Sequence, residues 1–107
     1  MSWDINLNAR TECGQLVHVD WKNYTSNVAQ MYFDALGGDG IRQFAGMKAK
    51  DAIPILREGV RKMRENPEKY KDMNPSNGWG DYEGALELLE WMLEKCEKYP
   101  SIEISVF

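Results

Sequence analysis

This chain lacks almost all of the residue patterns by which enzymes and metalloproteins are recognised. Its 107 residues include one histidine and two cysteines, and they contain no HExxH, CxxC, GxSxG or Walker motif. His18 has no nucleophile or orienting partner near it in the sequence, which favours a structural or surface role. The sequence therefore predicts no catalytic residue, no metal ligand and no cofactor.

Long apolar runs and a positive net charge are also missing. No segment approaches the roughly 18 apolar residues that a membrane span needs, and the first four residues do not begin a signal peptide. The net charge of -4 argues against a nucleic-acid partner. Two thiols, Cys13 and Cys96, are typical of a reduced chain, although a disulfide between them stays an open alternative. We expect a cytoplasmic protein without a membrane segment.

The composition that remains is that of an ordinary folded domain. Hydrophobic residues make up 43% of the chain, enough for a core that needs no disulfide or metal, and charged residues make up 28%. We find no repeat, linker or low-complexity tract. Residues 1–107 are therefore predicted to form a single globular domain.

Apolar and polar residues alternate at both ends of the chain, as they do in half-buried strands. Residues 3–7 and 102–107 show this period of two, and residues 16–19 form a second apolar strand after a glycine-containing turn at 11–14. An isolated hairpin is marginal in water, so we expect the C-terminal strand to join it in a small antiparallel sheet. Such a sheet has two open edges, which leaves homo-oligomers through a sheet edge as an alternative.

The middle of the chain has the spacing of amphipathic helices. We expect helices from Thr25 or Ser26 to Leu36, from Asp51 to Glu65 with Pro54 in the first turn, and from Asp81 to Lys98. Shorter helical turns are expected at 41–47 and 67–72, and the glycines at 37–40 end the first helix. The predicted fold is α+β, with a small antiparallel sheet packed against three main helices.

Glycines flank a tryptophan in the segment 74–83, the most unusual stretch of the sequence. Glycines on both sides of a large aromatic residue indicate backbone conformations that other residues avoid. As a binding site, Trp79 and Tyr82 would stack on a sugar or a base. The polar contacts would then come from Asn77, Asp81 and Glu83.

The same segment also has a purely structural interpretation. Pro75 and Gly78 would form turns, Trp79 would fill the edge of the core, and Asp81 would cap the following helix. Each of these residues has a local structural role, which favours this interpretation over the binding site.

A second polar block, at residues 23–27, lies between a predicted strand and a predicted helix. Its candidate binding residues are Asn23, Tyr24, Thr25 and Asn27. Polar residues at such junctions often contact ligands, and free N–H groups at a helix start can bind an anion or a carbonyl. The structural alternative is an N-cap supplied by Thr25 or Ser26.

Five glutamates form a row along the last predicted helix, at positions 83, 87, 90, 94 and 97. Their spacing by three and four places them on one helix face, away from the apolar stripe. We interpret them as a solvated face. The preceding helix, with Arg57, Arg61 and Arg64, offers a basic surface within the same molecule.

The blocks Asn23-Tyr24-Thr25-Ser26-Asn27 and Asn74-Pro75-x-Asn77-Gly78-Trp79-Gly80-x-Tyr82-Glu83 resemble small uncharacterised proteins encoded by bacteriophages and by some bacteria. The resemblance covers roughly residues 20 to 106. It implies a phage or prophage origin and that the two blocks belong to one recurring unit. It implies no activity and no catalytic residue.

We therefore expect a non-enzymatic binding module, with a groove between the 23–27 turn and the 74–83 loop. Its partner would be a protein or a small polar ligand. The main alternative is an enzyme on a sugar or nucleotide that uses Asp81 or Glu83 as acid or base. A third alternative is a protein-interaction module that uses the acidic last helix.

Overall fold

The sheet is built around β1 (Ser2–Arg10), which pairs with β2 (Leu16–Thr25) on one side and β3 (Glu103–Val106) on the other. Both pairings are antiparallel in this computed structural model, which describes residues 1–107. The main helices are α1 (Ala29–Leu36), α2 (Ala49–Glu65) and α4 (Tyr82–Lys98), with a short α3 (Pro67–Lys71). The predicted α+β fold is confirmed.

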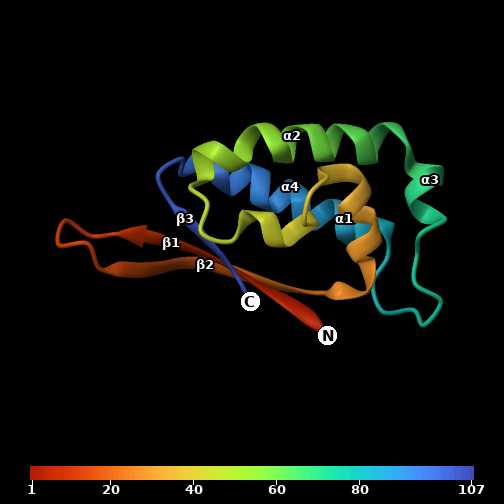
Figure 1. Cartoon of the computed structure of the whole chain (residues 1–107), viewed down its shortest axis with the longest axis horizontal. Helices are drawn as coiled ribbons and strands as arrows, with labels where there is room; N and C mark the ends of the chain where they lie inside the picture. The colour runs from red at the N-terminus through yellow and green to blue at the C-terminus, as the bar shows by residue number, and fades with distance from the viewer.

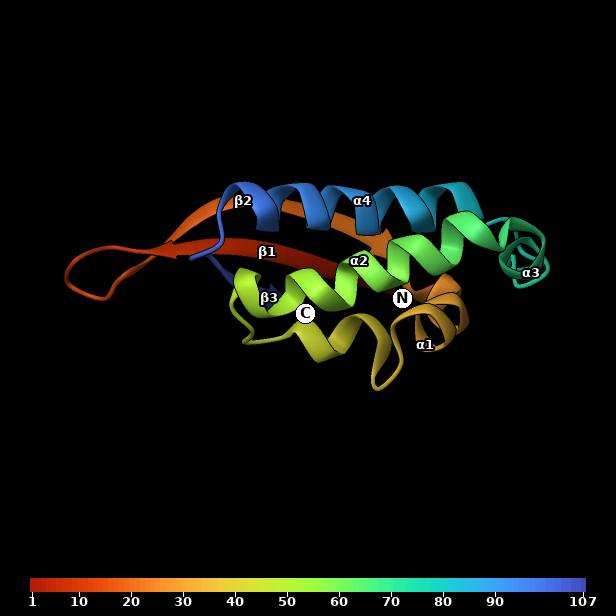
Figure 2. The same cartoon turned by 90° about the horizontal axis from the view of Figure 1, so that it is seen from above.

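The helices lie on one side of the sheet, with α3 beyond the end opposite the hairpin turn, and the hairpin of β1 and β2 extends past the helices at its turn (Figures 1 and 2). The alternation in β1 turns Trp3, Ile5 and Leu7 toward the helices, where they join a core of 24 buried residues. No polar side chain is buried.

We call the face of the sheet that points away from the helices the open face. Its central residues, by register, are Asp4, Asn6 and Asn8 of β1, Trp21, Asn23 and Thr25 of β2, and Ser105 of β3.

Strand β2 is much longer than predicted, because it runs to Thr25 rather than ending at Val19. Asn23, Tyr24 and Thr25 are thus strand residues, and the predicted 23–27 turn is wrong except for a 3-10 helix at Ser26–Val28. A bulge shifts the pairing between Leu7 and Asn8. The extra residue lies in β2, between His18 and Asp20. It interrupts the period of two, so the apolar–polar alternation of β2 cannot be followed past that point in the sequence.

On its helix side, β2 carries the charged residues Asp20 and Lys22 where a half-buried strand normally has apolar residues. The sequence therefore lacks the alternation by which this part of the strand could have been predicted. Asp20 pairs with Lys95 of α4 at 3.4 Å, and the Lys22 ammonium lies 5.6 Å from the centre of the Trp91 ring. Strand β2 therefore packs under α4 through an ion pair and a cation–π contact.

The two edges of the sheet differ. Beside β3, the Gly46 N–H donates to Ile104 O at 2.7 Å and the Ile104 N–H donates to Met47 O at 2.9 Å. The segment 46–48 thus covers the β3 edge. Only the β2 edge is open, so the expectation of two open edges is wrong.

Helix α2 begins at Ala49, two residues before the predicted Asp51. The Ala49 N–H donates to Ile102 O at 2.8 Å, and the Lys50 N–H donates to Pro100 O at 3.1 Å. These distant carbonyls cap the helix start, so no local capping residue was needed and none could be recognised. Pro54 consequently lies inside the helix rather than in its first turn. None of the helices has the length and hydropathy required to cross a bilayer.

Candidate functional site

The loop before α4 is organised by its asparagine side chains. Asn77 Oδ1 accepts from the Trp79 N–H at 3.0 Å, and Asn74 Oδ1 accepts from the Tyr82 N–H at 2.8 Å. Gly78 and Gly80 have φ values of 77° and 94°, which other residues rarely adopt. The backbone on both sides of Trp79 is therefore fixed, whatever the indole contacts.

The Tyr24 hydroxyl joins the end of β2 to the start of α4. It accepts a hydrogen bond from the Asp81 N–H at 3.1 Å. Asp81 Oδ1 in turn accepts from the Gly84 N–H at 2.7 Å, which confirms the predicted helix cap. Burial raises the pKa of Tyr24. The two polar blocks, far apart in sequence, are thus in direct contact.

Two glycines allow this contact. A Cβ at Gly80 would lie 2.5 Å from Thr25 Cγ2, and a Cβ at Gly84 would lie 2.2 Å from the Tyr24 hydroxyl oxygen. No real side chain tolerates such distances. The glycines are therefore required for β2 and the Trp79 loop to lie side by side.

Beside this contact lies a shallow hollow of about 560 Å³, which we call the Trp79 hollow. It is lined by Met1 and Ser2, by residues 23–25 at the end of β2, and by Asn27, Trp79 and Gly80. No charged side chain is among them. Trp79 is 70% exposed, so the interpretation that it fills the core edge is wrong.

Some polar groups of the hollow form hydrogen bonds within the protein, and others are left to bind a ligand. Asn23 Nδ2 donates to Ser2 Oγ, Trp3 O and Asp4 Oδ1 at 2.8–3.1 Å, which leaves Asn23 Oδ1 as an oriented acceptor. Thr25 Oγ1 accepts from the Asn27 N–H at 3.3 Å and keeps its own proton to donate. The Asn27 side chain makes no hydrogen bond within the protein. The hollow thus offers neutral donors and acceptors beside an indole.

Tyr82 is not part of the hollow, contrary to its predicted role as a stacking surface. It is 7% exposed, its hydroxyl donates to Met63 O at 2.6 Å, and its ring stacks on Tyr70 with centroids 6.5 Å apart. As the first residue of α4 it faces α2 and α3, so its role is to anchor the loop.

The remaining predicted site residues also lie outside the hollow. Asn77 and Asp81 use a side-chain oxygen for backbone hydrogen bonds within the loop. The Glu83 side chain is 66% exposed and lies 4.0 Å from the Lys71 ammonium. The structure therefore brings Asn23, Tyr24, Thr25, Asn27 and Trp79 together and leaves Asn77, Asp81, Tyr82 and Glu83 apart.

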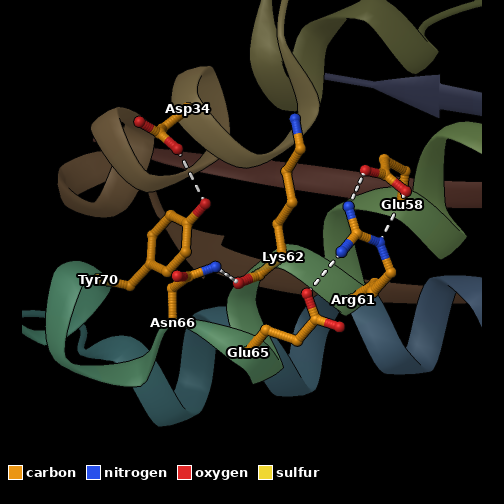
Figure 3. A network of polar contacts seen from close by, with 7 residues as sticks. All are labelled: Asp34, Glu58, Arg61, Lys62, Glu65, Asn66 and Tyr70. Carbon is orange, nitrogen blue, oxygen red and sulfur yellow. Dashed lines mark hydrogen bonds and ion pairs between the residues drawn. The ribbon is translucent and has the colours of Figure 1, made fainter.

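The other end of the loop follows α3, whose Tyr70 side chain points at Asp34 of α1 in Figure 3. The Tyr70 hydroxyl donates to Asp34 Oδ1 of α1 at 2.9 Å, and the Lys69 ammonium lies 3.0 Å from the same oxygen. These hydrogen bonds, first from Lys69 and then from Tyr70, lower the pKa of the Asp34 carboxyl. Burial raises the pKa of Tyr70. The loop is thus anchored on both sides by tyrosines.

The glutamate row on α4 is partly neutralised by α2. Arg57 contacts Glu97 at 2.7 Å, and Arg64 pairs with Glu90. The basic surface that the sequence indicated on the preceding helix is therefore used within the molecule. No three His, Cys, Asp or Glu side chains come together in a way that could hold a metal ion.

Two residues of the hollow, Met1 and Ser2, were not among the predicted site residues. Ser2 lies opposite Thr25 in the β1–β2 pairing. Only a β2 extended to Thr25 would have indicated this neighbour.

Comparisons with protein-family models, with curated proteins and with solved structures each found no match for this chain.

Proposed function

We propose that this protein is a non-enzymatic binding module and that its site is the Trp79 hollow. The observation that carries the proposal is the exposure of Trp79 on a loop whose backbone is held by other residues. The fold buries less than a third of this residue. Tryptophan is enriched among the residues that dominate binding energy in protein complexes, and it suits apolar ligand faces equally well.

The chemistry of the hollow supports a partner that is neutral and polar. Its lining has amide and hydroxyl groups from Asn23, Thr25 and Asn27 and no charged side chain. A phosphate-bearing ligand would meet no cationic side chain there, in agreement with the acidic net charge of -4. Either a protein segment or a small polar ligand fits this description.

The enzyme alternative has no observation in its favour. Asp81 is committed to capping α4, and Glu83 lies outside the hollow with a largely exposed side chain. A general acid or base needs to reach the bound substrate. The acidic-helix alternative is weakened in turn, because Glu90 and Glu97 pair with arginines of α2.

We also propose a cytoplasmic location, in a bacterial host if the chain is of phage origin. Its support is that both cysteines are free: Cys13 is exposed at the hairpin turn, whereas Cys96 is buried. Free thiols are typical of reducing compartments.

The proposal can be tested through the four tryptophans of the chain. Their indole N–H groups give separate nuclear magnetic resonance signals, which Trp→Phe variants assign. In a screen of short peptides and small polar molecules, we expect hits to shift the Trp79 signal and leave the buried Trp3 signal unchanged.

Variants then separate binding from folding. Trp79→Ala and Asn27→Ala are expected to abolish binding of the hits, measured by titration calorimetry because Trp79→Ala has no Trp79 signal, while the protein keeps its melting temperature. Phe33→Ala is the matched control, since Phe33 is also an exposed aromatic residue but lies on α1. If the two site variants only destabilise the protein and change no interaction, the proposal is wrong.

A further inference from the structure

The Trp79 hollow continues into the open face of the sheet. Trp21, Asn23 and Thr25 alternate along β2 and pair with Asn6, Asp4 and Ser2 of β1, so all three belong to the open face. Asn23 and Thr25 also line the hollow. Trp21 is 55% exposed. One continuous surface therefore leads from Trp79 past Asn23 to a second exposed indole.

The length of this surface suits a ligand of several units. At about 3.3 Å per strand residue, Trp21 lies about 13 Å from Thr25, which borders the hollow with Trp79. A ligand that contacts both indoles therefore has to extend over a distance of this order. A single small molecule confined to the hollow would leave Trp21 unused.

Amide and hydroxyl groups surround the two indoles on this surface, together with the Asp4 carboxylate, which accepts from Asn23 Nδ2 at 2.8 Å. Asn8 Nδ2 donates to Ser105 Oγ at 3.3 Å, and Asn6 lies in the row between Trp21 and Ser105. Arg10, the arginine of β1, is paired with Glu103. A sulfated or phosphorylated polymer would therefore find no unpaired arginine or lysine side chain among these residues.

An added peptide strand is disfavoured at the neighbouring β2 edge. Asp20 Oδ1 accepts from the Trp21 N–H at 2.8 Å, which occupies a donor that an added strand would need. The bulge opposite Leu7 and Asn8 twists the strand, and Asp20 and Lys22 point inward to α4. These features are the ones by which proteins protect an edge from strand addition.

We propose that this surface binds a neutral oligosaccharide, with one sugar ring on Trp79, another on Trp21, and hydroxyl groups hydrogen-bonded to Asn23 and Asn27 between and beside them. Sugar rings combine apolar C–H faces with hydroxyls that donate and accept. Flat aromatic rings beside oriented amides match both properties. This inference rests on the proposed function and adds the ligand class and a second subsite.

The test uses uncharged disaccharides and hexasaccharides of glucose, mannose, galactose and N-acetylglucosamine, with a heparin-derived hexasaccharide as the charged counterpart. We expect at least one neutral hexasaccharide to shift the indole signals of Trp79 and Trp21 but not that of the buried Trp3. Trp79→Ala and Trp21→Ala are each expected to weaken its binding by about tenfold, and Phe33→Ala to leave it unchanged.

The disaccharide gives the sharper control, because it can occupy only one subsite. Its binding at Trp79 is expected to be lost in Trp79→Ala and unchanged in Trp21→Ala. If Trp21→Ala has no effect on any hexasaccharide, the second subsite does not exist and the inference is overturned. Stronger binding of the heparin fragment would also overturn it.

The outcomes separate this inference from the proposed function. If peptides or other polar molecules shift the Trp79 signal and no neutral saccharide does, the hollow is a binding site but the ligand class is wrong. If nothing shifts the Trp79 signal, both proposals fail.

Discussion

Successive residues of β1 meet opposite surroundings. Ile5 and Leu7 are fully buried beneath the helices, whereas Asn6 and Asn8, their direct neighbours, lie partly exposed on the open face. The packed face holds only apolar side chains from β1 and β3. The open face holds amides, hydroxyls, the carboxylates of Asp4 and Glu103, and two exposed aromatic residues, Trp21 and Phe107. One face of the sheet thus supplies stability, and the other is left available for contacts outside the molecule.

The largest effect is expected from a pair of neighbouring substitutions in β1. Ile5→Ala removes a fully buried side chain and is expected to lower the free energy of unfolding by about 2–5 kcal/mol. Asn6→Ala, one residue away, is expected to change it by less than about 0.5 kcal/mol. Urea unfolding of both variants measures the difference. Equal losses would mean that the open face is covered or strained.

Because β2 contacts α4 at Gly84, we expect the effect of Gly84→Ala on the free energy of unfolding to change sign when Tyr24 is removed. Gly84→Ala places a Cβ against the Tyr24 hydroxyl, and such overpacking costs about 1–3 kcal/mol. In a Tyr24→Ala background the clash with the hydroxyl is absent and only a 3.0 Å contact with Asp81 Oδ1 remains. The same substitution is then expected to stabilise α4, by less than the full helix-propensity gain of about 1 kcal/mol. A double-mutant cycle by chemical denaturation measures both steps. A stabilising Gly84→Ala in the normal background would contradict the contact.

A smaller effect on stability is expected from Asp34→Asn in α1, since the Asp34 carboxylate contacts Tyr70 and Lys69 of α3. Because its pKa is lowered in the folded state, this carboxylate stabilises the protein above its unfolded pKa of about 3.9. That contribution is lost as the pH falls through the lowered, folded-state pKa. Asp34→Asn is expected to cost about 1 kcal/mol at neutral pH, since the group is one-third exposed and partly screened.

Denaturant unfolding at neutral pH and at several acidic pH values measures this dependence. The gap between the normal protein and Asp34→Asn is expected to close toward low pH. A constant gap would show that the variant acts through packing instead of charge.

The smallest effect on stability is expected from the largest exposed side chain of the loop. Trp79→Ala is expected to change the free energy of unfolding by no more than about 0.5 kcal/mol, because the loop backbone is held by Asn74, Asn77 and two glycines. Thermal and urea unfolding measure it. A loss of more than about 1 kcal/mol in the free energy of unfolding would show that Trp79 stabilises the fold. The main support for a binding site would then be removed.

The sequence predicted those parts of the fold in which local pattern and final environment agree. Strand β1 alternates because one of its faces is packed, and Asp81 precedes α4 as capping residues do. The second half of β2 could not be recognised, because its inward residues Asp20 and Lys22 are matched to Lys95 and Trp91 of a distant helix. A strand with charged residues on its packed face has the sequence pattern of a loop, and only the position of the partner residues shows that it is a strand.

The candidate site was predictable in its location but not in its side chains. The glycines on both sides of Trp79 indicated an unusual backbone in this loop, which the positive φ values of Gly78 and Gly80 confirm. The contact that joins the two polar blocks, at Gly80 and Gly84, is seen only in the structure. The orientations of Trp79 and Tyr82 were not predictable, because the turn chemistry of the loop is the same whichever aromatic ring is buried. The choice depends on Tyr70 and on Met63 O, which receive the Tyr82 ring and hydroxyl.

The pairing of β1 with β3 has a consequence for the order of events during synthesis. Asn8 and Ser105 are hydrogen-bonded across 97 sequence positions, whereas the hairpin and each helix form from neighbouring residues. On the ribosome, β1 therefore keeps one unpaired side until residues 103–106 emerge. Closing so long a loop is slow. The nascent chain thus passes through a period in which a hydrophobic central strand is exposed to other nascent chains and to chaperones.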